Sequence, residues 1–417
     1  MKKLLLLLAT LGMIMTACGP VDNNGIPSDK TQAIKFQDTN TKLICTLHWD
    51  ENEDGELSYK EAAAVADLGE TFAESSIMAF NELKFFTGLE SISNRAFKNC
   101  ESLVKITLPN SVTSIGHGAF SGCSSLTSVT VPNSVTSIGS SAFENCSSLT
   151  SVTIGNSVTS IGGHAFYGCS CLTSITIPDS VTWIGGYAFS GCSSLTSVTI
   201  GNDVTSIGEY AFKGCSSLTA FYSKLASADN RCLIIDGVLQ AFAPAGLTAY
   251  FIPDSVTSIG RSTFNNCSSL TSITIPDGVT SIGSYAFCNC SSLTSVTIPD
   301  SVTSIGNYAF RGCSSLTSVT IPNSVTLIGE GAFCYCGSLK SITIPDGVTS
   351  IGGDAFFDCS SLTSVYCKPT TPPTGGNYMF SNNASGRNIY VPTASVDEYK
   401  AATNWSAYAD YIVGYNF

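Results

Sequence analysis

The stretch from Ser124 to Cys146 reads SSLTSVTVPNSVTSIGSSAFENC, and it returns along most of the chain. Its leucine recurs every 23 residues, except for one step of 29 residues from Leu218 to Leu247. The other recurring leucines are Leu103, Leu126, Leu149, Leu172, Leu195, Leu270, Leu293, Leu316, Leu339 and Leu362. A fixed period in the twenties is typical of a solenoid, in which each repeat forms one coil that stacks on the previous coil.

A single coil cannot fold alone. Its apolar side chains contribute about 10 to 15 kcal/mol if they are fully buried. Ordering the backbone costs about 1 to 2 kcal/mol per residue, which over one coil exceeds that gain. Neighbouring coils must therefore cover both open faces of each repeat.

Within a repeat, two short strands and a turn are predicted. Residues Leu126 to Val131 alternate between apolar and hydroxyl side chains, which indicates a strand. Pro132-Asn133 favours a turn, and Val135 to Ile138 favours a second strand. The segment from Ala142 to Cys146 suits a short helical turn that leads to the next leucine. We therefore predict a β-rich leucine-repeat solenoid with short helical turns.

Composition excludes several classes of partner. Charged residues make up 12% of the chain and the formal net charge is -12. The sequence contains no cluster of Lys and Arg, so binding to nucleic acid or to an anionic membrane surface is not expected. Uncharged hydroxyl groups must supply most of the solvent-facing surface.

The N-terminus has the pattern of an export signal. Lys2 and Lys3 precede an apolar run from Leu4 to Met15, which is too short to span a bilayer. The sequence Met15-Thr16-Ala17-Cys18 then resembles the bacterial lipoprotein cleavage box, which implies a signal peptide over 1–17 and lipidation of Cys18. An ordinary cleaved signal is the alternative. Residues 18–35 are expected to form a tether, and the resemblance implies an exported protein anchored at the bacterial cell surface or outer membrane.

A helical segment with a calcium-binding pattern is predicted over residues 36–79. A helix from Asp38 to Trp49, with Leu43, Ile44 and Leu47 on its apolar face, leads into an acidic loop. A second helix is expected from Tyr59 to Leu68. The loop matches the EF-hand pattern, which offers hard oxygen ligands to Ca²⁺ on alternate residues. The expected ligands are Asp50, Asn52, Asp54, Glu56, Ser58 and Glu61. We expect Ca²⁺ to act as a structural clip, and the alternative is an acidic turn before a helix.

The repeat C-S-S-L-T-S-V-T-I-P-x-x-V-T-S-I-G-x-x-A-F-x-x resembles the BspA-like leucine-rich repeat of bacterial surface proteins. The resemblance covers residues 80–366, because Leu, Ile-Pro, Ile-Gly, Ala-Phe and Cys keep their offsets together. The resemblance to this family implies a curved solenoid that is exposed on the cell surface and binds other proteins or host matrix. The periodicity itself predicts only the scaffold.

One irregular repeat and a terminal cap are expected. In residues 218–246, the second half of the repeat is replaced by a hairpin pattern around Asp236-Gly237, which is either a binding protrusion or a neutral insertion. Residues 367–417 are expected to form an α+β cap, with a strand at Asn388 to Val391, a helix at Ser395 to Ala402 and a closing strand from Tyr411. Such a cap covers the apolar face of the last coil.

Eleven cysteines recur at one position of the repeat: Cys100, Cys123, Cys146, Cys169, Cys192, Cys215, Cys267, Cys290, Cys313, Cys336 and Cys359. Equivalent residues of adjacent coils lie about 5 Å apart with parallel Cα–Cβ bonds. A disulfide needs Cβ atoms that converge to about 3.8 Å. We therefore predict a buried ladder of reduced thiols that act as small apolar side chains. Cys288 with Cys290 and Cys334 with Cys336 lack partner histidines, so zinc is not expected.

The sequence contains no motif of a nucleophilic hydrolase, P-loop enzyme or zinc protease, so no enzymatic activity is expected. Two surfaces are candidates for binding. One is the variable edge of the coils, where tyrosine and arginine are the anchors that protein interfaces favour. Its expected partner-binding residues are Tyr187, Glu209, Tyr210, Arg261, Tyr285, Tyr308, Arg311 and Tyr335.

The second surface consists of parallel files of outward Ser and Thr side chains, such as Thr153, Thr176 and Thr199. These files are either a soluble sheet face without a ligand or a glycan-binding or ice-binding face. The favoured function is a monomeric, non-enzymatic scaffold for protein binding or adhesion. A passive surface-layer spacer is the remaining alternative.

Overall fold

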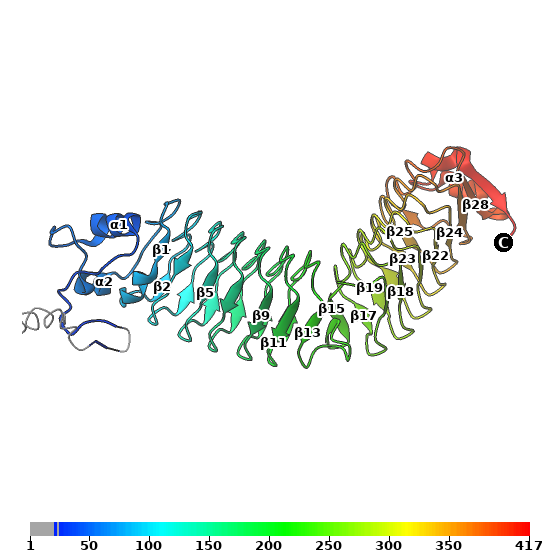
Figure 1. The fold of residues 1–417 in the computed structure, drawn as a ribbon. Helices are drawn as coiled ribbons and strands as arrows, with labels where there is room; N and C mark the ends of the chain where they lie inside the picture. Colours follow the sequence, from blue (N-terminus) through cyan, green and yellow to red (C-terminus); the bar gives the residue numbers. More distant parts are fainter. Residues whose placement is uncertain (1–20, 23–24) are drawn as a thin grey trace, which may run out of the picture.

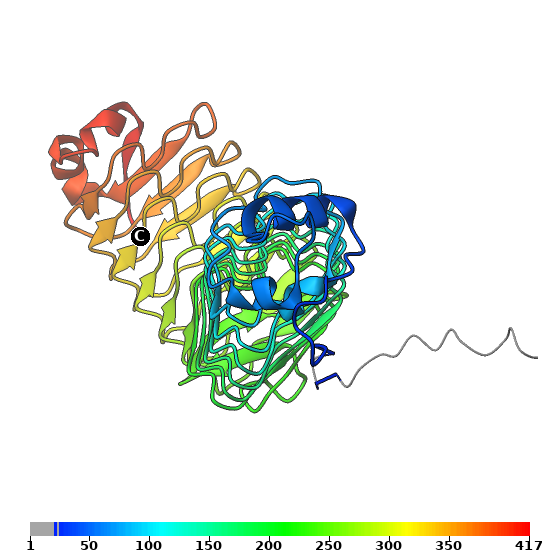
Figure 2. The same ribbon diagram turned by 90° about the vertical axis from the view of Figure 1, so that its left-hand side faces the viewer.

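The computed structural model describes residues 21–22 and 25–417. The predicted signal peptide and Cys18 lie outside the described residues. The chain forms one elongated stack of coils that bends in its middle (Figure 1). Seen from the N-terminal end, the C-terminal half leads away from the axis of the N-terminal half (Figure 2). The predicted solenoid is thus confirmed.

The first strands of the coils form a series in which most neighbours pair in parallel, although the series is divided into several short sheets. Ser128 lies opposite Ser151 and Val129 opposite Val152, so like residues stack on like. The strands of this series are β1 (Ala79–Phe80), β3 (Lys105–Ile106), β5 (Ser128–Thr130), β7 (Ser151–Thr153), β9 (Ser174–Ile177), β11 (Ser197–Ile200), β13 (Ala220–Tyr222), β16 (Ala249–Phe251), β18 (Ser272–Thr274), β20 (Ser295–Thr297), β22 (Ser318–Thr320), β24 (Ser341–Ile344), β26 (Ser364–Cys367), β28 (Asn388–Pro392) and β29 (Ile412–Tyr415).

The second strand of each coil forms a parallel series of its own, with Ile115 opposite Ile138 and Ile138 opposite Ile161. These strands are β2 (Ser91–Ile92), β4 (Ser114–Ile115), β6 (Ser137–Ile138), β8 (Ser160–Ile161), β10 (Trp183–Ile184), β12 (Ser206–Ile207), β15 (Val238–Phe242), β17 (Ser258–Ile259), β19 (Ser281–Ile282), β21 (Ser304–Ile305), β23 (Leu327–Ile328), β25 (Ser350–Ile351) and β27 (Thr374–Gly375). The antiparallel partner of β15 is β14 (Cys232–Ile235).

Helices lie at the two ends of the stack. Helices α1 (Thr39–Trp49) and α2 (Tyr59–Ala64) cover the N-terminal end of the stack, shown in blue in Figure 2. Helix α3 (Val396–Ala401) belongs to the C-terminal end. The short 3₁₀ helices are η1 (Asn81–Phe85), η2 (Thr393–Ser395) and η3 (Ser406–Tyr411). None of the described residues forms a helix that is long and apolar enough to cross a membrane.

The core contains a file of phenylalanine rings, one from each regular coil. Adjacent rings have centroids 5.0 to 5.4 Å apart and planes within 3 to 9° of parallel. The file extends past the expected repeat region, because Phe72 stacks on Phe97 and Phe380 stacks on Phe356. Each ring is therefore buried by the rings of its neighbours. This agrees with the expectation that one coil buries too little apolar surface to offset its own loss of backbone entropy.

The repeated cysteines lie buried beside this file, and all cysteines among the described residues are free thiols. Each thiol from Cys123 to Cys215 donates to a phenylalanine carbonyl of a neighbouring coil, as Cys146 does to Phe120 O at 3.2 Å. Burial raises the pKa of the Cys146 thiol to about 12. The thiols thus act as buried hydrogen-bond donors in addition to filling space.

The glycine of the Ile-Gly pair is required by the close approach of coils. A Cβ atom added at Gly139 would lie 2.7 Å from the carbonyl carbon of Gly116 in the preceding coil. The equivalent Gly185 would meet the backbone nitrogen of Gly163 at 2.4 Å. No side chain fits at this position unless the stack opens.

The predicted helical turn at Ala142 to Cys146 is wrong. These residues form consecutive turns, with Ser141 at a φ of 56° and Asn145 at a φ of 57°. Left-handed residues interrupt the right-handed helix, and here they direct backbone N–H groups toward the next coil: Ser141 N donates to Gly163 O and Asn145 N donates to Tyr167 O. Inter-coil hydrogen bonds have replaced those of a helix.

Two predictions for the N-terminal helices also need correction. Leu43 and Leu47 are 64% and 77% exposed, so the buried face of α1 is formed by Thr41 and Cys45 instead. The second helix ends at Ala64 rather than Leu68, since Val65 adopts an extended conformation and both Val65 and Leu68 are buried in the core.

The predicted hairpin is present, but it does not protrude. Its first strand, β14, pairs with β15, and β15 continues the second strand series by pairing with β17. Leu233 and Leu239 are fully buried. The hairpin is therefore part of the stack.

At this hairpin both strand series are interrupted, because β13 does not pair with β16 and β12 does not pair with β15. The hydrophobic core divides into two clusters at the same place. We call residues 210–267 the junction.

Candidate functional site

The variable edge of the solenoid is built on a column of left-handed residues. The residue five positions before each ladder cysteine has a positive φ, as Tyr187 (59°), Tyr210 (59°) and Ser262 (61°) do. This column consists of Arg95, Gly118, Ser141, His164, Tyr187, Tyr210, Ser262, Tyr285, Tyr308, Gly331, Asp354 and Tyr378. Because a left-handed backbone is costly for a bulky side chain, the three consecutive large residues His164, Tyr187 and Tyr210 are unusual at such a position.

The rings of this column stack on one another outside the core. The ring centroids of His164 and Tyr187 are 4.8 Å apart, those of Tyr187 and Tyr210 are 4.7 Å apart, and those of Tyr285 and Tyr308 are 5.0 Å apart. At the junction, Tyr210 and Tyr285 are tilted by 59° at 6.3 Å, since Ser262 stands between them in the column. We call His164, Tyr187, Tyr210, Tyr285 and Tyr308 the aromatic edge.

Charged groups lie against the aromatic edge. Arg261 forms an ion pair with Glu209 at 3.1 Å and places its guanidinium 5.4 Å from the ring centroid of Tyr285. The Tyr308 hydroxyl donates to the Glu330 carboxylate, which together with partial burial raises the pKa of Tyr308. Partial burial also raises the pKa of Tyr187. The raised pKa values keep Tyr187 and Tyr308 as neutral hydrogen-bond donors near neutral pH.

Four of the expected binding residues lie in other columns. Glu209 and Arg261 directly precede members of the left-handed column, whereas Arg311 and Tyr335 lie nearer to their ladder cysteines. Tyr335 directly precedes its ladder cysteine, is 42% exposed and contacts Phe357 edge-on. Arg311 lies 5.4 Å from the Tyr335 ring centroid. The structure thus brings Tyr187, Tyr210, Tyr285 and Tyr308 into one edge together with Glu209 and Arg261, whereas Arg311 and Tyr335 form a separate pair.

Two residues of this edge are absent from the sequence-based prediction. His164 continues the ring stack, and Lys213 places its ammonium 5.2 Å from the Tyr210 ring centroid. His164 could have been found from the sequence, because it lies five residues before the ladder cysteine Cys169, as Tyr187 does before Cys192. Lys213 has the same offset from Cys215 as Arg311 has from Cys313, but Lys213 packs on the Tyr210 ring of the edge whereas Arg311 packs on Tyr335.

The stacking limits what this edge can bind. Because the ring faces cover one another, the edge presents ring rims and hydroxyl groups to solvent. A sugar that packs on an aromatic face cannot do so along the stack. The polar backbone and side-chain groups of a protein partner can form hydrogen bonds with these hydroxyls, and its apolar atoms can pack against the ring edges.

The Ser and Thr files are in register, as predicted. Thr130 lies opposite Thr153, and Thr176 lies opposite Thr199. At the junction, however, the Thr position is taken by aromatic residues. Tyr222 lies opposite Thr199 and Phe251 lies opposite Thr274, and these residues are 52% and 76% exposed. The hydroxyl lattice is thus divided into two shorter patches.

The acidic loop has the donors that Ca²⁺ prefers, but its side chains contact their own backbone. Asp50 Oδ2 accepts from Gly55 N at 2.8 Å, and the Glu61 carboxylate accepts from Ser58 in a capping box at the start of α2. Asp50 Oδ1 is buried without a hydrogen-bond partner. No three acidic, His or Cys side chains of the described residues are grouped to hold a metal ion. Calcium binding at Asp50, Asn52, Asp54, Glu56, Ser58 and Glu61 therefore stays a prediction, and it requires Glu61 to leave the capping box.

These features define a leucine-rich repeat solenoid with a half-buried aromatic edge. The family model described as the BspA type leucine rich repeat region matches residues 70–162, 136–232, 239–363 and 326–403. The chain belongs to this family.

Solved structures of similar proteins support the assignment. A leucine-rich repeat protein from Bacteroides ovatus is 31% identical with a TM-score of 0.56, and the match covers 79% of this chain and 82% of that protein. A leucine rich cell surface protein from Faecalibacterium prausnitzii is 32% identical with a TM-score of 0.54, covering 76% of this chain and 80% of that protein. A search of curated proteins found no match.

Proposed function

We propose that this protein is a non-enzymatic lipoprotein of the bacterial cell surface whose aromatic edge binds a protein partner, such as a component of the host matrix. One observation supports this proposal above the others. The aromatic edge is a row of half-buried tyrosines, interrupted only at Ser262 and flanked by arginine and lysine, on the stacked coils of the solenoid.

The energetics of binding favour such a row. Tyrosine and arginine are enriched where partners contribute most to affinity. Rings that are already stacked lose little conformational freedom on binding, so more of the contact energy appears as affinity. The solenoid positions four tyrosines at fixed spacings, which suits an extended partner.

The test compares two sets of surface substitutions. In the first variant, Tyr187, Tyr210, Tyr285 and Tyr308 are changed to Ser. In the control, Thr153, Thr176 and Thr199 of the hydroxyl files are changed to Lys. Binding of immobilised host matrix proteins to the mature chain is measured by biolayer interferometry, with thermal melting to confirm folding.

We expect the tyrosine variant to lose binding and the threonine variant to keep it. If only the threonine variant loses binding, and it also loses glycan-array or ice binding, the binding site is the hydroxyl files and not the aromatic edge. Equal binding by all three proteins would exclude the aromatic edge. If native protein binds nothing, a passive spacer is the better description.

The cell-surface location has a separate test. The F. prausnitzii relative is described as a cell surface protein, and the Cys18 motif suggests a lipid anchor. Cells that express the chain are labelled with a clickable fatty acid, and the Cys18→Ser variant is the control. We expect label on the native protein alone, and protease treatment of intact cells should remove it. An unlabelled native protein would argue for an ordinary cleaved signal.

A further inference from the structure

At the junction, the hydrogen bonds that join one coil to the next along the edge are not formed. In the preceding coil, Tyr187 N, Phe189 N and Gly191 N donate to carbonyl oxygens of the following coil at 2.7 to 2.9 Å. The equivalent donors Tyr210, Phe212 and Gly214 have no hydrogen-bond acceptor within the described residues. The pattern resumes in the next coil, where Ser262 N donates to Ser284 O.

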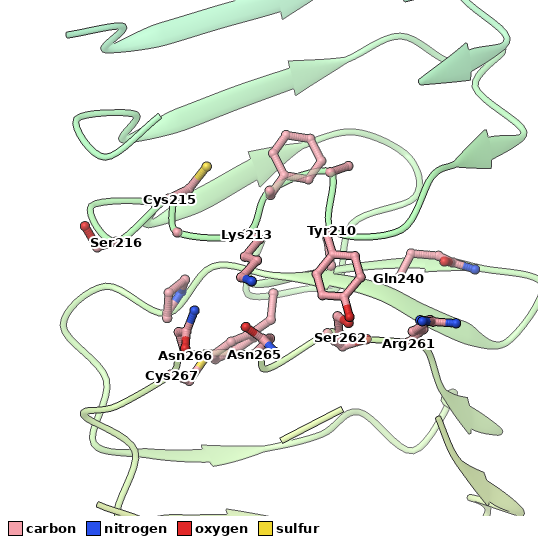
Figure 3. A pocket seen from close by; sticks show the side chains of 17 residues that line it. Tyr210, Lys213, Cys215, Ser216, Gln240, Arg261, Ser262, Asn265, Asn266 and Cys267 are labelled. Carbon is pink, nitrogen blue, oxygen red and sulfur yellow. The ribbon is translucent and has the colours of Figure 1, made fainter. Parts of the chain in front are cut away.

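A cavity of about 60 Å³ lies between these two coils (Figure 3). Tyr210, Phe212 and Gly214 line one wall, and Ser262 and Asn265 line the other. Figure 3 shows the Tyr210 and Lys213 side chains extending from the first coil toward the second. The cavity can hold about four or five non-hydrogen atoms, since one water needs about 10 to 15 Å³ of such volume.

Two buried polar side-chain atoms on the second wall also lack partners. The Ser262 side chain is 8% exposed, and its Oγ atom forms no hydrogen bond. Asn265 Oδ1 is likewise buried without a partner. Because a buried polar group without a hydrogen-bond partner is destabilising, the cavity favours a polar occupant that satisfies both walls.

The charge at the cavity is positive although the chain is acidic overall. Lys213 and Arg261 both line it. Arg261 is neutralised by Glu209, whereas Lys213 forms no ion pair within the described part of the chain. An anion is therefore favoured over a neutral or cationic ligand.

We propose that this cavity binds a small oxyanion that also carries a proton, for which hydrogen phosphate is the simplest example. Its oxygens would accept from the unpaired backbone N–H groups and from Lys213. Its hydroxyl group would donate to Asn265 Oδ1, which a fully deprotonated sulfate cannot do. The bound ion would bridge the two halves of the stack. This site does not depend on the proposed adhesive role.

Isothermal titration of the mature protein with inorganic phosphate tests the proposal, with sodium chloride at matched ionic strength as the blank. Two variants remove the site. Lys213→Gln removes the unpaired charge. Ser262→Tyr fills the cavity with a tyrosine ring, the side chain found at the equivalent position in the coils of Tyr210 and Tyr285. Lys98→Gln is the matched control, because Lys98 occupies the same position in its own coil.

We expect saturable phosphate binding, weakened at least about tenfold by Lys213→Gln and abolished by Ser262→Tyr, with no change in Lys98→Gln. Sulfate should bind at least about tenfold more weakly than phosphate. Competition by O-phosphoserine would show that the phosphate group can be carried by a partner, whereas no competition would restrict the site to the free ion. No saturable binding, equal binding of sulfate, or unchanged binding in both site variants would overturn the proposal. Thermal melting of Ser262→Tyr establishes that this variant is folded.

Discussion

At the scale of the residue, the repeat is constrained by how closely its coils approach. The glycine of each Ile-Gly pair could be recognised in the sequence by its constancy, but the reason for it could not. The structure shows that a Cβ atom at Gly139 would clash with the backbone of the preceding coil. Close approach between coils is a property of the assembled stack, so no single repeat reveals it.

The Gly139→Ala variant tests this constraint. The added methyl group forces the stack apart, so we expect a loss of about 3 kcal/mol of unfolding free energy. The neighbouring Ser140→Ala change should have an effect within about 0.5 kcal/mol, because Ser140 is exposed. Urea unfolding followed by circular dichroism measures both. Equal midpoints for the two variants would contradict the close-approach explanation.

The thiols give a second prediction at this scale. Cys171 is exposed, whereas Cys146 and Cys192 are buried and burial raises the pKa of each to about 12. Only the thiolate reacts with iodoacetamide, so the buried thiols should stay unmodified up to about pH 9 in native protein. Peptide mass spectrometry should find Cys171 modified first. Modification of Cys146 at a similar rate without unfolding would contradict the buried ladder.

At the scale of the element, apolar and polar alternation predicted the strands well, because each strand buries one face in the core. The segment after the second strand was predicted less well. Its i, i+1, i+4 spacing of apolar residues suits a helix, but Gly or Asn before most ladder cysteines, as at Gly122 and Asn145, signals a left-handed residue. The inter-coil hydrogen bonds then determine the conformation.

The acidic loop between α1 and α2 is predicted to bind Ca²⁺. Binding would draw Asp50 and Glu61 together and would fix α1 relative to α2. We expect millimolar Ca²⁺ to raise the melting temperature by several degrees, with EDTA reversing the effect and Mg²⁺ unable to replace it. The Asp50→Asn variant should lose the response. Identical melting curves with Ca²⁺ and with EDTA would dispose of the site and leave the loop as a capped acidic turn.

At the scale of the whole molecule, the 23-residue period predicted the solenoid, and the single 29-residue step marked where it changes. The sequence could not show that both strand series, the phenylalanine file and the edge hydrogen bonds all break there. Strand pairing depends on which backbone groups meet across coils, and the hairpin at β14 and β15 changes that. The aromatic edge was predicted in part, since column membership follows from the offset to the ladder cysteine.

The account depends on a stack whose hydrogen bonds between coils along the edge are formed in each coil except at the junction. Amide hydrogen exchange, measured residue by residue in phosphate-free buffer, tests this most directly. We predict that Tyr210, Phe212 and Gly214 exchange at least about tenfold faster than Tyr187, Phe189 and Gly191 one coil earlier. Equal protection of the two sets would contradict the interrupted stack and the cavity within it.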